Sequence, residues 1–327
     1  MRWIIRRVML LLSTFIIATS MDFVLIRLTP GNPIDLYIQD LLLQGYPYDA
    51  AVKMAASLLP FIPNEPLYKQ YIDFMLGAIK GDFGKSIYFG QDVTVILGYA
   101  LPWTLFVVSI SLILSFIVGV VTGMFIAYKR GGMIDKFVSI WSSVFSSIPQ
   151  YIVGFFLILF FALQLKIFPS MGAYSPWVTP GWNIEFIKSV LYHATLPILT
   201  YFFTSVGGWI LTMKSSTLSV LGEYYVTAAE ARGLKDSRIA ITYVGRNAIL
   251  PLFTRLAISF GYIFGGSVLI ENTFSYPGIG RFLNLSITYR DYPLTSGCFL
   301  IITFSVVISN FIADLLYSRL DPRITLE

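Results

Sequence analysis

The sequence predicts an all-α integral membrane protein with six transmembrane helices. Of its 327 residues, 56% are hydrophobic and only 13% are charged, and the mean hydropathy is +0.73. This is more apolar surface than one water-soluble core can bury, so lipid must cover the rest. The apolar residues also gather in six long segments separated by polar loops.

Each of these segments is long enough to cross a bilayer, since about 20 apolar residues in a helix span the roughly 30 Å hydrocarbon layer. The predicted spans are residues 4–28, 103–128, 137–163, 191–213, 249–269 and 294–316. The first segment also resembles a secretory signal peptide, because Arg6 and Arg7 precede an apolar run. No small-residue cleavage site follows that run, so we favour a retained helix.

The basic residues predict the orientation of the chain. The loops 1–7, 129–136, 214–248 and 318–327 carry 13 Lys and Arg residues. The loops 29–102, 164–190 and 270–293 carry 8 over about twice the length. Because basic residues concentrate in cytoplasmic loops, both termini are expected inside the cell. The net charge of +5 is then a topology signal, and no nucleic acid partner is expected.

The spans and loops divide the chain into four predicted parts. These are a first transmembrane helix (1–28), an extracytoplasmic loop domain (29–102), a core of five transmembrane helices (103–317) with the inner loop 214–248, and a cytoplasmic tail (318–327).

The composition argues against several kinds of chemistry. His193 and Cys298 are each the single residue of their type, so no histidine cluster for a metal, no internal disulfide and no catalytic constellation is expected. The stretch Gly81 to Ser86 resembles a phosphate-binding loop, but Ile79 stands where that motif needs its first glycine. No nucleotide, metal or other cofactor is therefore expected in this chain.

The inner loop is predicted to form two short helices with a corner. Good helix formers occupy 223–232, Gly233 can end a helix in the left-handed conformation, and Asp236 or Ser237 could cap the next one. Small alanines keep the first helix slim enough to enter a groove on a soluble partner. The expected contact residues are Tyr225, Ala228, Ala229, Glu230, Ala231, Gly233 and Leu234. The alternative is an amphipathic helix on the lipid surface, but the broad apolar face that this requires is missing.

Polar residues on a helical stripe mark a candidate pathway through the membrane. Serines recur every three to four residues along the third span, where Pro149 can bend the helix. The pathway candidates are Ser143, Ser146, Ser147, Gln150 and Tyr262. Such residues also serve as packing contacts between helices, and this alternative stays open. Asp22 in the first span is expected to pair with Arg27 or to face neighbouring helices.

Several separated motifs together resemble one known family, the inner-membrane permeases of ABC importers of the dipeptide, oligopeptide and nickel type. The motifs are Arg27-Leu28-Thr29-Pro30-Gly31-Asn32-Pro33, Gly81-Asp82-Phe83-Gly84-x-Ser86, Tyr225-Val226-x-x-Ala229-x-Ala231-x-Gly233-Leu234, Arg246-Asn247-Ala248-x-Leu250-Pro251, Phe274-Ser275-Tyr276-Pro277-Gly278-Ile279-Gly280, Arg290-Asp291-Tyr292-Pro293 and Asp321-Pro322-Arg323. The resemblance covers nearly the whole chain. Thr227 departs from the general form of the inner loop, where a glutamate is expected, as in the peptide-type branch.

The resemblance implies a permease subunit of the prokaryotic inner membrane. Its inner loop would be the coupling loop, called the EAA loop, which docks on one of two cytoplasmic ATPase subunits that hold ATP and magnesium. A second, homologous permease would complete the pathway. An extracytoplasmic substrate-binding protein would deliver the substrate near the outer segment 271–293, for which the contact candidates are Phe274, Tyr276, Pro277 and Gly278. The Pro-Gly pair there predicts a tight turn. The alternative is that these residues serve only to shape the chain and make no contact with a binding protein.

The sequence leaves alternatives open for the class of the protein and for its substrate. Oligopeptides are the first expectation, oligosaccharides the second and nickel the third. An ion-coupled secondary carrier is a different class, but it needs titratable groups near the membrane midplane, and the second to sixth spans nearly lack them. A membrane enzyme is disfavoured for want of a catalytic constellation.

Overall fold

The computed structural model describes residues 2–28, 33–58, 66–263 and 268–320. Within these ranges the regular structure is helical, apart from one isolated β-bridge between Lys85 and Asp92. The predicted all-α class is thereby confirmed. Four helices are long and apolar enough to cross a membrane: α1 (Arg2–Leu28), α5 (Val93–Tyr128), α8 (Ile184–Leu221) and α15 (Tyr292–Leu320).

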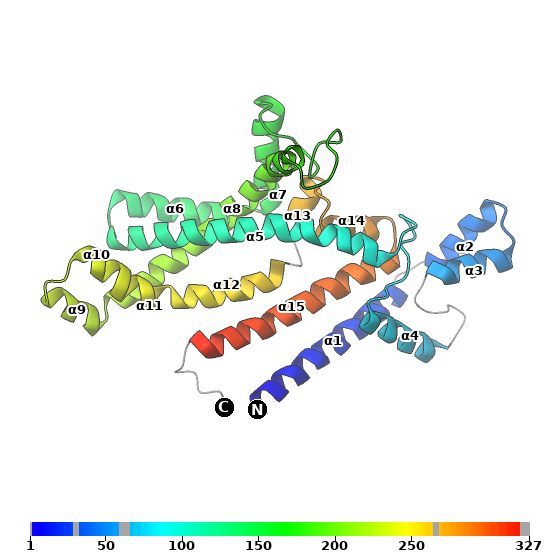
Figure 1. Cartoon of the computed structure of the whole chain (residues 1–327), viewed down its shortest axis with the longest axis horizontal. Coiled ribbons are helices and arrows are strands. Elements are labelled where there is room, and N and C mark those ends of the chain that lie inside the picture. Colours follow the sequence, from blue (N-terminus) through cyan, green and yellow to red (C-terminus); the bar gives the residue numbers. More distant parts are fainter. Residues whose placement is uncertain (1, 29–32, 59–65, 264–267, 321–327) are drawn as a thin grey trace.

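Two groups of helices make up the body of the molecule (Figure 1). In the first, α8 lies between α5 and α6 (Met133–Ser147). In the second, α15 packs against α1 and against α12 (Leu250–Tyr262), which also contacts α5 and α8. A buried cluster with Phe116, Trp209 and Leu252 joins α5, α8 and α12.

Helices α5 and α8 approach each other closely. An added Cβ at Gly119 would lie 2.3 Å from Trp209 Cβ, and one at Gly123 would lie 2.5 Å from the carbonyl oxygen of Ile210. The Gly-x-x-x-Gly spacing thus lets the two backbones touch, as in other membrane helix pairs. The corresponding pair Gly261 and Gly265 lies outside the residues whose contacts are described.

The predicted third span is broken rather than straight. Helix α6 ends at Ser147, and α7 (Gln150–Leu157) with the π-helix η1 (Ile158–Gln164) continues at an angle of 101°. Pro149 is the residue directly before α7. A proline has no backbone N–H to donate to the preceding helical turn, so α6 does not continue through it. The bend expected from Pro149 is therefore present.

The other predicted boundaries differ in instructive ways. Helix α5 begins at Val93, so residues 93–102 belong to this helix and not to the outer loop. Helix α12 covers only Leu250–Tyr262 of the predicted span 249–269, and residues 264–267 lie outside the described structure. With thirteen residues at ~1.5 Å per residue, α12 alone is shorter than the hydrocarbon layer.

The outer loop is folded onto the body. It contains α2 (Pro33–Leu43), α3 (Tyr48–Leu58) and α4 (Leu67–Lys80). A small core combines Ala55 and Phe74 of these helices with Phe23 of α1 and Leu300 of α15. The loop thus lies over one end of the α1–α15 pair. Asp22, next to Phe23, is buried and faces Ser296 of α15, while the side chain of Arg27, its other expected partner, lies outside the described residues.

Two short segments complete the chain. Between α8 and α12 lie α9 (Tyr224–Ala231), α10 (Asp236–Arg238), η2 (Ile239–Gly245) and α11 (Arg246–Ala248), which form one end of the molecule (Figure 1). Between α12 and α15 lie α13 (Val268–Thr273) and α14 (Ile279–Thr288).

Candidate functional site

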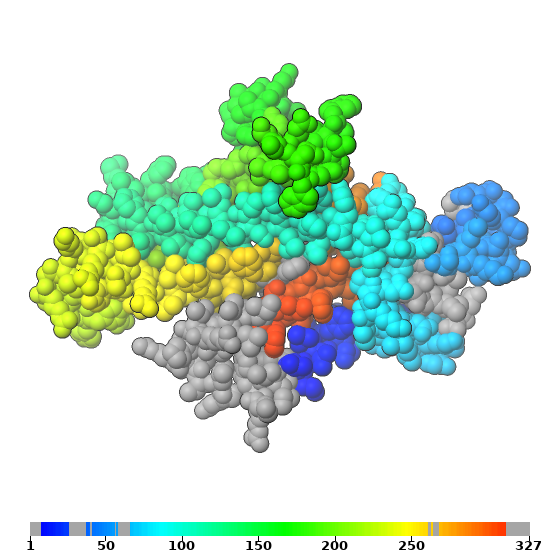
Figure 2. Space-filling model, viewed as in Figure 1, coloured from blue at the N-terminus to red at the C-terminus, as the bar shows by residue number. Residues whose placement is uncertain are grey.

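The inner loop forms a compact projection, which we define as residues 222–248. In Figure 2 it occupies the end of the molecule opposite α2 and α3. Its two arms, α9 and the run α10–η2–α11, are joined by a sharp corner at Gly233, whose φ is +69°. The predicted pair of short helices with a glycine corner is thus present. The caps predicted for the second arm are wrong, because Lys235 stands at the N-cap and no side chain caps α10.

The corner at Gly233 is a Schellman motif. The amide of Leu234 donates to the carbonyl of Ala229 over 3.3 Å, and the amide of Gly233 donates to the carbonyl of Glu230 over 2.9 Å. These bonds satisfy the carbonyls that the end of α9 leaves unpaired, and they require a left-handed residue at 233. Glycine adopts that conformation without strain, so it fixes the direction in which α9 points.

The two arms share a small apolar core. Val226 and Ala229 of α9 are buried against Ile239 and Val244, and Leu234 packs half-buried beside them. Because these side chains point inward, the opposite face of α9 is free. The exposed residues on α9 include Tyr224, Tyr225, Ala228, Glu230 and Ala231. Of the predicted contact residues, Ala229 and Leu234 therefore shape the projection, and Tyr225, Ala228, Glu230 and Ala231 present its surface.

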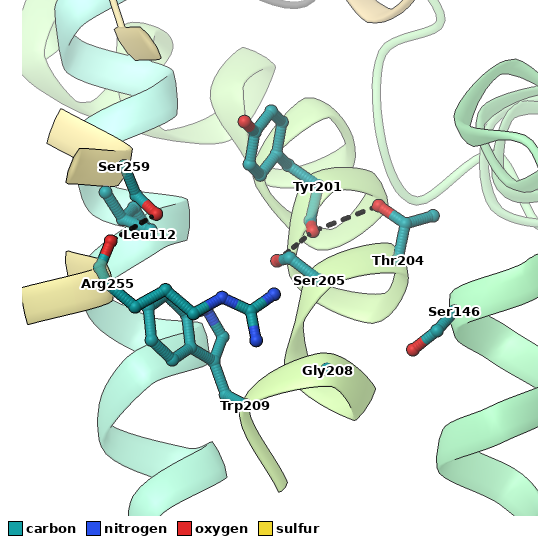
Figure 3. A pocket seen from close by; sticks show the side chains of 9 residues that line it. All are labelled: Leu112, Ser146, Tyr201, Thr204, Ser205, Gly208, Trp209, Arg255 and Ser259. Atoms are coloured by element: carbon teal, nitrogen blue, oxygen red, sulfur yellow. Dashed lines mark hydrogen bonds between the residues drawn. The ribbon is translucent and has the colours of Figure 1, made fainter. Parts of the chain in front are cut away.

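A cavity of about 320 Å³ opens among α5, α6, α8 and α12 (Figure 3). It is lined by Leu112, Ser146, Tyr201, Thr204, Ser205, Gly208, Trp209, Arg255 and Ser259. Of the predicted pathway residues whose side chains the structure describes, only Ser146 belongs to this lining. Ser143 and Ser147 are exposed elsewhere on α6, Gln150 begins α7, and the side chain of Tyr262 lies outside the described residues.

Sequence reasoning missed most of this lining, although a signal for it exists. The α8 residues from Tyr201 to Trp209 that line the cavity follow the spacing i, i+3, i+4, i+7 and i+8, which places them on one helix face. Serines of α6 also make packing contacts: the carbonyl of Ser142 and the hydroxyl of Ser146 approach Gly207 so closely that no Cβ fits there.

An ion pair also joins α6 and α8. Lys214 of α8 contacts the carboxylate of Asp135, and it also donates to the Ser139 hydroxyl over 2.9 Å. Asp135 accepts from the amide of Gly131 over 3.0 Å. These contacts tie the α5–α6 turn to α8 on the side of the chain that carries the projection.

A second polar cluster is built from two motifs far apart in the sequence. Ser86 donates a hydrogen bond to the carboxylate of Asp291, and the amide of Tyr88 donates to the same oxygen over 3.1 Å. The other oxygen accepts from the amide of Leu294 over 3.3 Å, in the first turn of α15. Tyr88 also stacks on Tyr289, with ring centroids 4.0 Å apart. The turn at Gly81–Ser86 is thus occupied by a carboxylate of the chain itself.

A buried glutamate organises the outer segment between α12 and α15. Glu271 accepts from the Thr104 hydroxyl over 2.8 Å and from the amide of Gly280 over 2.7 Å, while Thr104 accepts from the amide of Ile279 over 2.9 Å. The free amides that begin α14 are thereby satisfied. Burial raises the pKa of Glu271 to about 7, although the hydroxyl and amide donors act in the opposite direction.

The candidates for contact with a binding protein lie around this glutamate. Phe274 and Tyr276 are buried within the chain, Pro277 is half-buried, and a Cβ at Gly278 would lie 2.3 Å from Glu271 Cδ. The amide of Gly278 donates to the carbonyl of Tyr276 over 2.7 Å, so the expected tight turn is present. Docking at these residues stays a prediction.

Comparison with known proteins now identifies the class. Residues 119–326 match the family described as the binding-protein-dependent transport system inner membrane component. The match covers more than half of the chain, and the apolar helices fit a multi-pass protein of the cell membrane. The chain belongs to this family of transport permeases.

Individual relatives are similar over almost their whole length. The chain is 31% identical to a protein of Sinorhizobium fredii named as a probable peptide ABC transporter permease, with 98% of each chain covered. It is 30% identical to the oligopeptide transport system permease protein AppB of Bacillus subtilis, again with 98% of each covered. It is 29% identical to the di/tripeptide transport system permease protein DppB of Pseudomonas aeruginosa, with 98% of each covered.

Proposed function

We propose that this chain is a permease subunit of an ATP-driven, binding-protein-dependent importer of oligopeptides. Together with a second, homologous permease it would form the alternating-access pathway. The projection 222–248 carries the proposal, because a rigid corner presents a slim exposed helix face that a soluble partner can grip. The relatives support the substrate class, since their names include oligopeptide and di/tripeptide transport.

The energetics favour a seated helix over scattered surface charges. Moving a two-state protein from about 1:99 to 99:1 takes roughly 5.5 kcal/mol of differential interaction. Exposed salt bridges contribute under about 1 kcal/mol each, so a few of them do not suffice. A helix that lies in a groove and moves with an ATPase dimer can supply the difference. We assign this role to α9, with Ala228 and Ala231 facing the groove and Glu230 at its rim.

The membrane topology that goes with this function has six crossings, with both termini in the cytoplasm. The bent pair α6 and α7–η1 would be the third crossing, and the segment that begins with α12 would be the fifth. The excess of Lys and Arg in the inner loops supports this orientation. It places the projection in the cytoplasm and the Ser86–Asp291 cluster outside.

ATP and magnesium would belong to two ATPase subunits and not to this chain. The stretch Gly81–Ser86 lacks the first glycine of a phosphate loop, and Ser86 already bonds to the Asp291 carboxylate. A negative charge at that position would repel a phosphate. This subunit would be non-catalytic, and an extracytoplasmic binding protein would deliver the peptide near Pro277.

Reconstitution tests the proposal. The chain is co-purified with its second permease and ATPase subunits, reconstituted in liposomes, and supplied with binding protein and a labelled peptide. We expect uptake that requires ATP and all subunits. Uptake by the chain alone without nucleotide would indicate an ion-coupled carrier instead, and uptake of oligosaccharide without peptide would overturn the substrate class.

A further inference from the structure

The cavity among α5, α6, α8 and α12 contains a cation in a polar setting. Its volume of about 320 Å³ is at the lower end of the range for small-ligand sites. The lining includes the hydroxyl groups of Ser146, Thr204, Ser205 and Ser259. Arg255 extends from α12 toward α8, and its guanidinium reaches into this space (Figure 3).

The guanidinium of Arg255 is held in place from one side. Its Nη1 donates to the Thr212 hydroxyl over 2.7 Å, and its Cζ lies 4.9 Å from the centre of the Trp209 ring. Trp209 is itself buried against Phe116 in the body of the molecule. The arginine is exposed, and the buried Trp209 ring and the Thr212 hydroxyl orient its guanidinium from one side.

No acidic partner compensates this charge within the described part of the chain. The ion pair found there joins Lys214 to Asp135, and no described carboxylate lies within ion-pair distance of Arg255. A guanidinium has five N–H donors in a planar fork, and the bond to Thr212 uses one of them. Donors therefore remain for a planar anion, which arginine binds in bidentate fashion.

An arginine on an apolar helix is costly unless it faces a polar cavity. Arg255 lies in the second turn of α12, and charged side chains on membrane helices that face a cavity often mark pathways for substrates or ions. Anchoring α12 to α8 could be done by a neutral side chain at lower cost. The retained charge, the open donors and the hydroxyl lining point to an anionic ligand.

We propose that Arg255 binds the carboxylate of a peptide as it passes through the cavity. The hydroxyl of Ser146 would supply a neutral hydrogen bond to the same group, while Thr204 and Ser205 donate theirs to the Tyr201 carbonyl and line the cavity with oxygen atoms. This inference rests on the proposed function, since it assumes a peptide substrate with a free C-terminus. It adds a specificity-determining residue inside the membrane, separate from selection by the binding protein.

The test compares two forms of one peptide, one with a free C-terminal carboxylate and one with a C-terminal amide. Uptake of each is measured in the reconstituted transporter with wild type, Arg255→Gln and Arg255→Lys. The binding protein is the same throughout, so its own preference cancels in the variant-to-wild-type ratio. We expect Arg255→Gln to lower uptake of the acid about tenfold and of the amide less than twofold. Uptake of the acid by Arg255→Lys should lie between that of wild type and that of Arg255→Gln. Lysine keeps the positive charge but lacks the planar guanidinium that binds a carboxylate in bidentate fashion.

Lys188→Gln is the matched control. It removes the same charge from an exposed position near the start of α8, away from the cavity, and should leave both uptakes unchanged. Equal losses of acid and amide uptake in Arg255→Gln would overturn the inference, as would no loss of either. A wild-type transporter that takes up neither peptide would overturn the proposed substrate class, and the inference with it.

Discussion

Ser86 donates a hydrogen bond to the carboxylate of Asp291, although 205 residues separate them in the sequence. Both are buried, and both belong to short motifs that looked independent in the sequence. The bond joins the turn before α5 to the start of α15, so the two outer motifs form one structural unit. The Asp291 carboxylate also accepts hydrogen bonds from the backbone amides of Tyr88 and Leu294, so it is the centre of the cluster.

Asp291→Ala should destabilise the chain strongly. It leaves a buried hydroxyl and two amides without their acceptor, and each such loss costs about 1–3 kcal/mol. We expect the thermal unfolding midpoint of the detergent-purified transporter to fall by several degrees. Asp92→Ala is the control, because that side chain is exposed and makes no capping bond. Equal midpoints for the two variants would contradict the role of the cluster.

Gly119→Ala should separate α5 from α8. The new Cβ would lie 2.3 Å from Trp209 Cβ, and overpacking of this kind costs about 1–3 kcal/mol. The same change at Gly98, also on α5, meets no atom within 4 Å and should be neutral or stabilising, since alanine favours helices by up to about 1 kcal/mol. Thermal unfolding of both variants tests this. A Gly119→Ala protein as stable as Gly98→Ala would show that the helices do not touch there.

Gly233→Val should uncouple transport. No atom lies within 4 Å of a Cβ at this position, so the cost is backbone strain at a φ of +69° and not a clash. A left-handed conformation costs a non-glycine residue about 1–2 kcal/mol, and a β-branched one more. We expect peptide uptake to fall more than tenfold with normal abundance in the membrane. Gly233→Asn should be milder, because asparagine tolerates this conformation.

Gly222→Ala is the matched control for the projection, since its φ of −80° suits any residue. It should leave uptake normal. If Gly233→Val also transports normally and still co-purifies with the ATPase subunits, the corner is not needed for coupling.

The stability of the transporter should fall as the pH rises toward 8. The folded-state pKa of Glu271 is raised from 4.5 to about 7, so the folded chain holds this proton more tightly than the unfolded chain. The stabilisation of the folded chain that comes from the proton on Glu271 is complete below pH 4.5 and is lost as the pH rises through about 7. Glu271→Gln should flatten the dependence of the unfolding midpoint on pH in this window.

The absolute stability of Glu271→Gln should also be lower, because an amide nitrogen cannot accept the bonds that one carboxylate oxygen now accepts. Glu185→Gln, at an exposed position in the first turn of α8, should keep the pH dependence of the wild type. An unchanged slope in Glu271→Gln would assign the effect to another group.

Local rules in the sequence predicted several elements well. The corner at Gly233 and the bend at Pro149 both follow from the conformational preference of one residue. Apolar runs also located the four long helices, because length and hydropathy are enough to mark a span.

Features that depend on tertiary contacts could not be predicted from the sequence. Helix α5 extends back to Val93 because Val93 and Leu97 pack against α14 and α15, and no cap marks that choice. Arg255 was not among the predicted pathway residues, and its place in a cavity depends on Trp209 of another helix. Phe274 and Tyr276 looked available to a partner, but packing with Ile270 and Leu196 buries them.

The contact between Glu271 and Gly278 has an evolutionary consequence. The carboxyl group fills the volume that a side chain at 278 would need, with only 2.3 Å between Glu271 Cδ and the would-be Cβ. A larger residue at 278 is then tolerable only beside a shorter one at 271. The two positions should vary jointly among relatives, so that a lineage that has lost the acid is free to lose the glycine as well.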